Sequence, residues 1–233
     1  MSDPGFFSVK QFECHGCGNC CRSVYRSKKL HNGFFVSDAE AEWLREEAKK
    51  QKIQISFKPY ESIADKNSKK LIVKSWRLNH DSCPFFSAGK CTVYDRRPLI
   101  CRSFPVVNTG LHGGQAFVRS LICPSEKEFT PPEKTIVKES IEIMKQRYGD
   151  NFYSAFLMEE LHFDEKSVVD SLMESGKIKP RPDIGGYKPI GLYEYLEDIH
   201  EDGSNRMKII QDEILKLEIT KNKVANLEKS ISR

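Results

Sequence analysis

The eight residues Cys14-His15-Gly16-Cys17-Gly18-Asn19-Cys20-Cys21 hold four cysteines. Two-residue spacers allow successive thiolates to converge on one point, as structural zinc sites and iron–sulfur clusters require. Gly16 and Gly18 suit such a tight path, because glycine reaches positive φ without a Cβ penalty. The stretch therefore predicts that the chain folds around a metal, and the rest of the chain is interpreted outward from it.

Four more cysteines lie far along the chain and must return to this stretch through the fold if they share its chemistry. Eight cysteines are enough for two tetrahedral sites, for two clusters, or for one site with spare thiols. Neighbouring side chains of an extended backbone point to opposite faces, so Cys20 and Cys21 could serve two centres, or one could be a free thiol. The candidate metal ligands are Cys14, Cys17, Cys20, Cys21, Cys83, Cys91, Cys101 and Cys123.

The sequence leaves the identity of the metal open between an iron–sulfur cluster and zinc. Dense thiolates and the doubled cysteine favour a cluster. However, the cysteine followed by proline that closes a bacterial ferredoxin motif is absent locally, although Cys83-Pro84 or Cys123-Pro124 could supply it from a distance. An iron–sulfur centre implies electron transfer, whereas zinc implies a structural role or metal handling.

The length and the termini of the chain indicate in which cellular compartment we expect the protein. With 233 residues it can bury a core without cross-links. The first residues show no signal-peptide pattern, and no stretch is long and apolar enough to cross a bilayer, so we expect a soluble, cytoplasmic protein. In a reducing cytosol the cysteines serve as ligands or redox groups rather than disulfides, unless the source is a hyperthermophile.

The charge is divided unevenly along the chain. Residues 1–120 hold 20 Lys and Arg against 11 Asp and Glu, a net charge of +9, and the remainder holds 17 against 22, a net charge of −5. The basic half balances thiolate charge or attracts an acidic or redox protein partner. Nucleic acid is less favoured, because no nucleic-acid motif accompanies the charge.

Local signals predict an α+β fold: a small, irregular, cysteine-rich metal domain with short strands, followed by a mainly helical half. Ser37 and Glu40 form a capping box that begins a helix over 38–50. We expect strands over 71–78 and 115–122, a hairpin over 83–91 that turns at 87–90, and a helical turn between Pro98 and Pro105. Helices are expected over 130–148, 150–162, 164–175 and 192–200.

We divide the chain into a cysteine-cluster domain (1–128), a helical segment (129–203) and a C-terminal amphipathic helix (204–233). Residues 179–182 resemble an extended linker within the second part. The 3–4 spacing of apolar residues in the last part fits a coiled coil that forms a homodimer. A helix packed back on its own domain explains the pattern equally well.

The motif Cys14-x-x-Cys17-x-x-Cys20-Cys21, with Cys83-Pro84-Phe85-Phe86 and the later Cys91 and Cys101, resembles the YkgJ-type cysteine-cluster family, the CxxCxxCC zinc- or iron-chelating domain. The resemblance covers roughly residues 12–125. It implies a metal-chelating module; some relatives are described as iron–sulfur oxidoreductases, and flagellin lysine N-methylases share the cysteine pattern. A protein lysine N-methylase is therefore the alternative to a metal-binding or redox role, and whether the chain is an enzyme stays open.

Charged residues near the cysteines allow two interpretations. Arg22, Arg96, Arg97 and Arg102 would lower nearby thiol pKa values and stabilise a thiolate cluster. Alternatively, Asp95 pairs with these arginines in a purely structural role, which we expect to dominate. His15 could replace a thiolate as ligand, but a histidine in a loop more often faces solvent.

Overall fold

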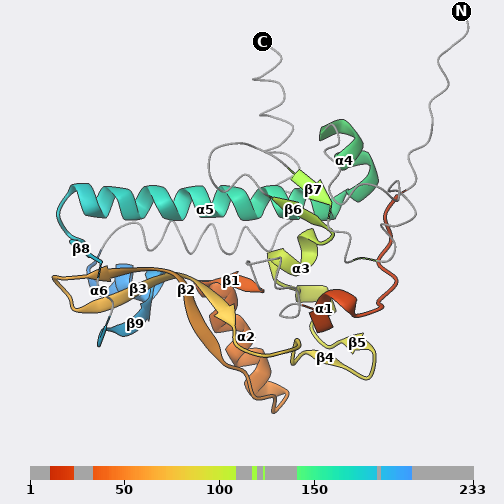
Figure 1. The fold of residues 1–233 in the computed structure, drawn as a ribbon, viewed down its shortest axis with the longest axis horizontal. Coiled ribbons are helices and arrows are strands. Elements are labelled where there is room, and N and C mark those ends of the chain that lie inside the picture. The colour runs from red at the N-terminus through yellow and green to blue at the C-terminus, as the bar shows by residue number, and fades with distance from the viewer. Residues whose placement is uncertain are drawn as a thin grey trace, which may run out of the picture.

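The computed structural model describes residues 11–23, 34–108, 117–119, 123, 141–182 and 185–200, and its helices and short, mainly antiparallel strands confirm the α+β class (Figure 1). The helices are α1 (Asn19–Ser23), α2 (Asp38–Lys50), the 3-10 turn η1 (Tyr94–Arg96), α3 (Leu99–Ser103), α4 (Ile141–Tyr148), α5 (Asp150–Glu174) and α6 (Leu192–Asp198). The strands are β1 (Phe35–Ser37), β2 (Phe57–Asp65), β3 (Lys70–Leu78), β4 (Phe86–Ser87), β5 (Lys90–Cys91), β6 (Val106–Asn108), β7 (Phe117–Arg119), β8 (Pro180–Arg181) and β9 (Lys188–Gly191).

Strand β3 is the centre of the main sheet. β2 pairs with it along its whole length, while antiparallel β1 and parallel β9 share its other edge. β8 adds to the far side of β2, giving the order β1-β3-β2-β8. The strand expected over 71–78 is confirmed, and the sheet takes strands from both sides of the expected boundary at residue 128.

Two segments differ from the expectations. The sequence indicated no strand for β2, whose side chains are mostly half-buried and polar, so they lack the β-branched alternation that marked β3. The expected linker over 179–182 contains β8, where Ala64 pairs with Arg181 and Asp65 with Pro180. Both are near a sheet edge, where a polar composition is tolerated.

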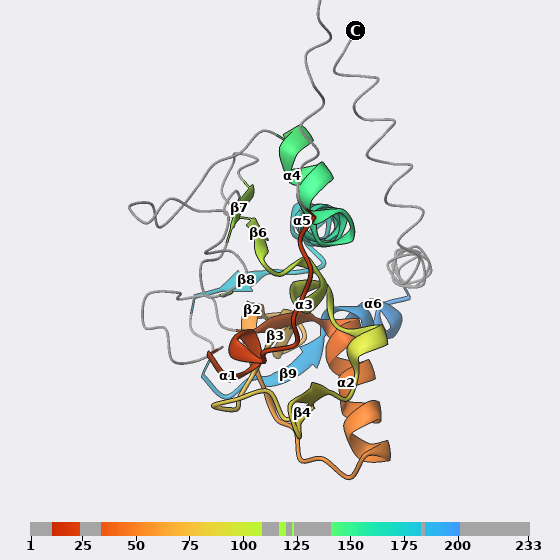
Figure 2. The ribbon, with the colours of Figure 1, turned by 90° about the vertical axis from the view of Figure 1, so that its right-hand side faces the viewer.

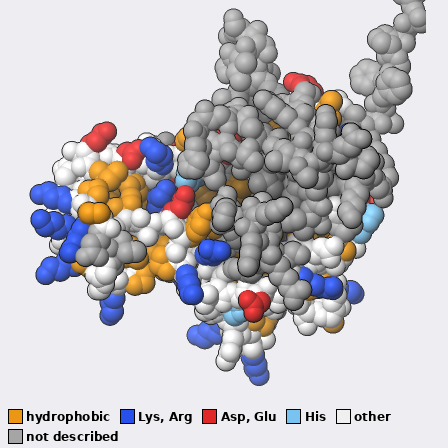
Figure 3. All heavy atoms as spheres, in the orientation of Figure 1, with side chains coloured by type: hydrophobic (Ala, Val, Ile, Leu, Met, Phe, Trp, Pro, Cys, Tyr) orange, Lys and Arg blue, Asp and Glu red, His pale blue; other side chains and the backbone are white. Residues whose placement is uncertain are grey.

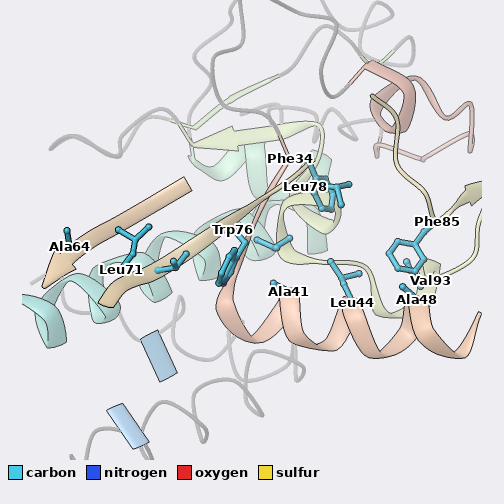
Figure 4. Close-up of a cluster of buried hydrophobic side chains, with 12 residues drawn as sticks. Phe34, Ala41, Leu44, Ala48, Ala64, Leu71, Trp76, Leu78, Phe85 and Val93 are labelled. Carbon is cyan, nitrogen blue, oxygen red and sulfur yellow. The ribbon is translucent and has the colours of Figure 1, made fainter. Parts of the chain in front are cut away.

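Helix α2 covers one face of the sheet. Its capping box is formed as predicted, with the Glu40 amide donating to Ser37 Oγ (3.3 Å) and the Ser37 amide donating to Glu40 Oε2 (3.1 Å). Ala41, Leu44 and Ala48 are buried on its inner side. Figure 4 shows how they pack against side chains of β3 and of the segment that contains the hairpin, namely Leu71, Trp76, Leu78, Phe85 and Val93. Val73 of β3 belongs to the same cluster.

Helix α5 lies on the opposite side of the sheet. Ile72 of β3 packs with Val169 and Leu172 of α5 and with Leu192 and Leu196 of α6. The sequence predicted two helices here, over 150–162 and 164–175, but the structure has one helix of 25 residues. Neither glycine nor proline interrupts residues 150–174, so nothing breaks the backbone hydrogen bonding before Gly176.

The short α3 lies beneath the N-terminal part of α5. Leu99 of α3 packs against Leu157 and Leu161 of α5, and Figure 2, which looks along α5, shows α3 just below it. Pro98 precedes α3 and the helix ends before Pro105, as predicted. The hairpin is also confirmed, with Phe86 opposite Cys91 and Ser87 opposite Lys90.

Several expectations concern residues that the structure does not describe. They include the first residues of the helix expected over 130–148, the ends of the strand expected over 115–122, and the amphipathic helix over 204–233 with its homodimer. No helix among the described residues is both apolar and long enough to cross a membrane.

A buried carboxyl group predicts how stability responds to pH. Glu165 of α5 is only 3% exposed and accepts a hydrogen bond from the Tyr193 hydroxyl (2.7 Å). Burial raises the pKa of its carboxyl group from 4.5 to about 8. Between these values the folded protein keeps a proton that the unfolded chain releases, so this group makes the free energy of unfolding fall as pH rises.

We therefore expect Glu165→Gln to be more stable than the wild type above pH 8, by on the order of a few kcal/mol, and to lose this advantage towards pH 5. Urea unfolding at pH 5, 7 and 9 measures the difference. Asp170→Asn on the same helix is the control, because Asp170 forms only an exposed ion pair with Lys166. Parallel pH curves for Glu165→Gln and the wild type would show that Glu165 is ionised in the fold.

Candidate metal centre

The cysteine-rich stretch ends in helix α1, which carries Cys20 and Cys21. Gly16 and Gly18 precede it with φ of 63° and 72°, so both occupy the positive-φ region that the sequence predicted. The two adjacent cysteines lie in a helical turn rather than an extended chain, and their sulfurs are 3.9 Å apart. The backbone is therefore not extended here, as the two-centre interpretation assumed, and the two sulfurs lie close together rather than on opposite faces.

The hairpin and α3 bring three more thiols to this place. The Cys83 amide donates to the Cys21 carbonyl (2.9 Å), which fixes the start of the hairpin against the end of α1. Cys83, Cys91 and Cys101 are half-buried and pack against the core between α2 and β3. We call Cys20, Cys21, Cys83, Cys91 and Cys101 the thiol cluster.

The ionisation of these thiols shows that they act on one another. The hydrogen bond between the Cys20 and Cys21 thiols lowers the pKa of Cys20 from 9.0 to about 7 and raises the pKa of Cys21. Burial raises the pKa of Cys83 to about 11, with Cys91 and Cys20 adding electrostatic repulsion. Burial also raises the pKa of Cys101 well above its usual value, and Cys83, Cys20 and Cys91 repel its thiolate.

Arginine side chains border the thiol cluster but do not pair with Asp95, so that expectation is wrong among the described residues. Arg97 donates from Nε to the Tyr94 carbonyl and lies over the Tyr94 ring, with its Cζ 4.0 Å from the ring centre. Arg97 also lowers the pKa values of Cys20, Cys91 and Cys101.

Two further arginines stack on aromatic rings from other parts of the chain. The Cζ atom of Arg96 lies 5.1 Å from the centre of the Trp43 ring, and the Cζ atom of Arg22 lies 5.2 Å from the centre of the Phe86 ring. Stacking fixes each guanidinium without neutralising its charge. These aromatic partners were not predicted, since Trp43 and Phe86 lie more than fifty residues from the arginines they contact.

The other predicted ligands are less closely placed. Cys14 is exposed and lies near enough to Cys91 to raise its pKa. Cys17 and His15 are exposed. Cys123 is buried, but its neighbours in the chain are not described. The structure thus gathers five of the eight predicted cysteines and places Cys14 beside them.

The donor set of the thiol cluster fits a thiophilic metal. With Zn–S bonds of about 2.3 Å, a tetrahedral site places its sulfurs about 3.8 Å apart, close to the 3.9 Å between Cys20 and Cys21. Within the described ranges, no three Cys, His, Asp or Glu side chains already stand in a metal-holding arrangement. Binding therefore requires the cysteine side chains to rotate towards one another, and it requires their deprotonation.

Convergent thiols from three segments define the class of this protein as a thiolate metal-binding protein. Residues 13–135 match the family described as "CxxCxxCC: Putative zinc- or iron-chelating domain". The match covers more than half of the chain, so the protein belongs to this family, as its cysteine pattern predicted. No curated protein and no solved structure matches the sequence.

The close approach of Gly18 to the hairpin gives a test of the site's architecture. A Cβ at Gly18 would collide with the Phe86 ring, whereas a Cβ at Gly16 would meet no atom within 4 Å. Both glycines have positive φ, so both alanine variants are strained. We expect Gly16→Ala to cost about 1 kcal/mol of stability and Gly18→Ala about 2 kcal/mol or more, since only the second also displaces the hairpin.

Thermal unfolding of the two variants measures this difference. A third variant combines Gly18→Ala with Phe86→Ala and so removes the ring. In the Phe86→Ala background, Gly18→Ala should lower the stability by less than it does in the wild type. Equal losses in Gly16→Ala and Gly18→Ala would mean that α1 does not rest on the hairpin.

Proposed function

We propose that the thiol cluster holds one metal ion in a tetrahedral, four-thiolate site and that this ion is zinc. The observation that carries the proposal is the 3.9 Å separation of the Cys20 and Cys21 sulfurs, which suits two ligands of the same ion. In a four-iron cluster each cysteine binds a different iron, so such close sulfurs are not needed. Tetrahedral sulfur coordination is typical of zinc or iron, and iron would make the site redox-active.

The site would act mainly as a cross-link between segments. α1, the β4–β5 hairpin and α3 are short and separated in sequence, and one ion bound by cysteines from all three would hold them together. Four thiolates around a divalent ion carry a net charge of about −2, and Arg97 with the neighbouring Arg96 and Arg22 offsets this charge. The metal thereby contributes directly to folding.

Metal analysis and serine substitution test this function. The purified protein should be colourless and hold one zinc per chain, and Cys83→Ser and Cys101→Ser should each lose most of it, because a serine oxygen is a poor replacement for a thiolate. Ser87→Ala is the matched control, since Ser87 lies in the same hairpin and is exposed. Elemental analysis after dialysis against a weak chelator provides the measurement.

A brown protein that contains iron and acid-labile sulfide would contradict the zinc site and make the protein an iron–sulfur protein. Cys14, Cys17 and Cys123 stay predicted metal ligands, and a second centre is where we propose that they bind. Two metal ions per chain, one of them lost on Cys17→Ser or Cys123→Ser, would establish that centre. The lysine N-methylase alternative stays a prediction from the family resemblance, since no described contact bears on it.

We further propose that one end of the main sheet docks an acidic protein partner. The turn from β2 to β3 lies against the segment before β8, where the Lys66 amide donates to the Lys179 carbonyl (2.9 Å), and Lys70 lies opposite Lys188. This basic end is formed by Lys66, Lys69, Lys70, Lys177, Lys179, Arg181 and Lys188. Lys and Arg side chains crowd the left edge of Figure 3, where these strands end.

The carboxylates Asp65 and Asp198 at the basic end each interact with a neighbouring group. Asp65 is fully buried and accepts hydrogen bonds from the Ser68 and Lys179 amides, and Asp198 pairs with Lys70 (2.6 Å). Six of the seven cations are exposed. Such a surface attracts a negatively charged partner at long range.

Binding to poly-L-glutamate by fluorescence anisotropy tests the basic end. We expect Lys66→Gln/Lys69→Gln/Lys179→Gln to bind about fivefold or more weakly at low salt. Lys49→Gln/Lys50→Gln/Lys52→Gln removes equal charge from exposed positions at the end of α2 and should bind like the wild type. Equal weakening in both variants, or a preference for single-stranded DNA of the same charge, would contradict an acidic protein partner at this surface.

A further inference from the structure

Helix α3, which carries Cys101, has no N-cap side chain of its own. Its N-cap position is Pro98, which makes no capping hydrogen bond. Instead, the Leu99 amide donates to Glu40 Oε1 of α2 at 2.6 Å, across 59 positions of the sequence. A carboxylate from another helix therefore takes the place of the missing cap.

The same carboxylate also caps its own helix. Glu40 Oε2 accepts hydrogen bonds from the Ser37 amide (3.1 Å) and the Ser37 hydroxyl (3.4 Å). Each oxygen of Glu40 thus serves one helix N-terminus, so the start of α2 and the start of α3 are fixed relative to each other. α2 is the largest helix on this face of the sheet and is anchored in the core by Ala41, Leu44 and Ala48.

A second side chain holds the other end of α3. Asn151 of α5 donates from Nδ2 to the Arg102 carbonyl and to the Phe104 carbonyl, each at 2.7 Å. These carbonyls lie at the C-terminal end of a five-residue helix, which cannot satisfy them internally. Asn151 lies outside residues 13–135, so the helical half of the chain contributes directly to the cysteine-bearing part.

We propose that Glu40 and Asn151 are positioning residues that clamp α3 at both ends and so hold Cys101 in the orientation needed for metal binding. This inference rests on the proposed function of the thiol cluster. Five residues are too few for a helix to be stable alone, so its direction depends on these two attachments and on Leu99 packing against α5. Residues that orient a ligand in this way typically change metal affinity by about 10- to 100-fold.

Zinc affinity, measured by competition with a chromophoric chelator, tests the clamp. We expect Glu40→Ala and Asn151→Ala to bind zinc about tenfold or more weakly. Glu40→Gln should restore most of the affinity, because its amide oxygen can still accept from the Leu99 amide. Ser37→Ala is the matched control: it removes the acceptor for the Glu40 amide and the longer of the two bonds to Glu40 Oε2, but it leaves the bonds from the Ser37 and Leu99 amides in place. It should therefore lower stability without changing zinc affinity.

Cobalt substitution adds a measurement that a change in stability alone would not affect. An altered Cys101 position changes the visible spectrum of a tetrahedral cobalt–thiolate site. Glu40→Ala and Ser37→Ala with equal stability losses and unchanged affinity and spectra would overturn the clamp. If the wild type binds neither zinc nor cobalt, the proposed function fails by itself. Hydrogen exchange of the Leu99 amide in the metal-free protein still tests the hydrogen bond from Leu99 to Glu40. The exchange rate should increase in Glu40→Ala and not in Ser37→Ala.

Discussion

The covering of β3 on both faces is the constraint on which the rest of the structure depends. Leu71 and Val73 pack under α2, and the intervening Ile72 packs against α5 and α6. Alternate residues of a strand point to opposite faces, so a strand with apolar residues at consecutive positions needs a cover on each side. The N-terminal α2 and the C-terminal α5 and α6 supply these two covers, and both halves of the chain thereby support one sheet.

This arrangement explains how short cysteine-bearing elements acquire a fixed place. Helices α1 and α3 have five residues each, and the β4–β5 hairpin has only two paired positions. None of these elements is stable alone. They pack against longer elements: Phe85 and Val93 lie in the core beside α2, and Leu99 packs against α5. The thiols are thus positioned by packing of their short elements against the core.

The residues around the thiol cluster stabilise the negative charge of its thiolates only in part. Burial and mutual repulsion oppose ionisation of Cys83 and Cys101, while Arg97 favours the thiolates of Cys20, Cys91 and Cys101. A bound cation would supply the charge that the arginines do not. The unfavourable ionisation of the free thiols is therefore consistent with a site built for a metal.

Several features of the fold were predictable because they depend on residues close in sequence. The capping box of Ser37 and Glu40, the positive φ of Gly16 and Gly18, and the hairpin turn over 87–90 all arise within four residues and appear as expected. Strand β2 and the unbroken α5 were not predicted. The pairing of β2 depends on β3, and the continuity of α5 shows only as an absence of helix breakers.

The sequence by itself determined that thiol ligands are present, how the first four are spaced, and that the family is a metal-chelating one. Only the tertiary structure decided which thiols meet, that Cys20 and Cys21 point to one place, and that Arg96, Arg97 and Arg22 rest on aromatic rings rather than on Asp95. It also decided that Glu40 reaches Leu99. The physical reason is distance along the chain: spacing and capping act between near neighbours, whereas most of these contacts join residues that only the packing of α2, β3 and α5 brings together.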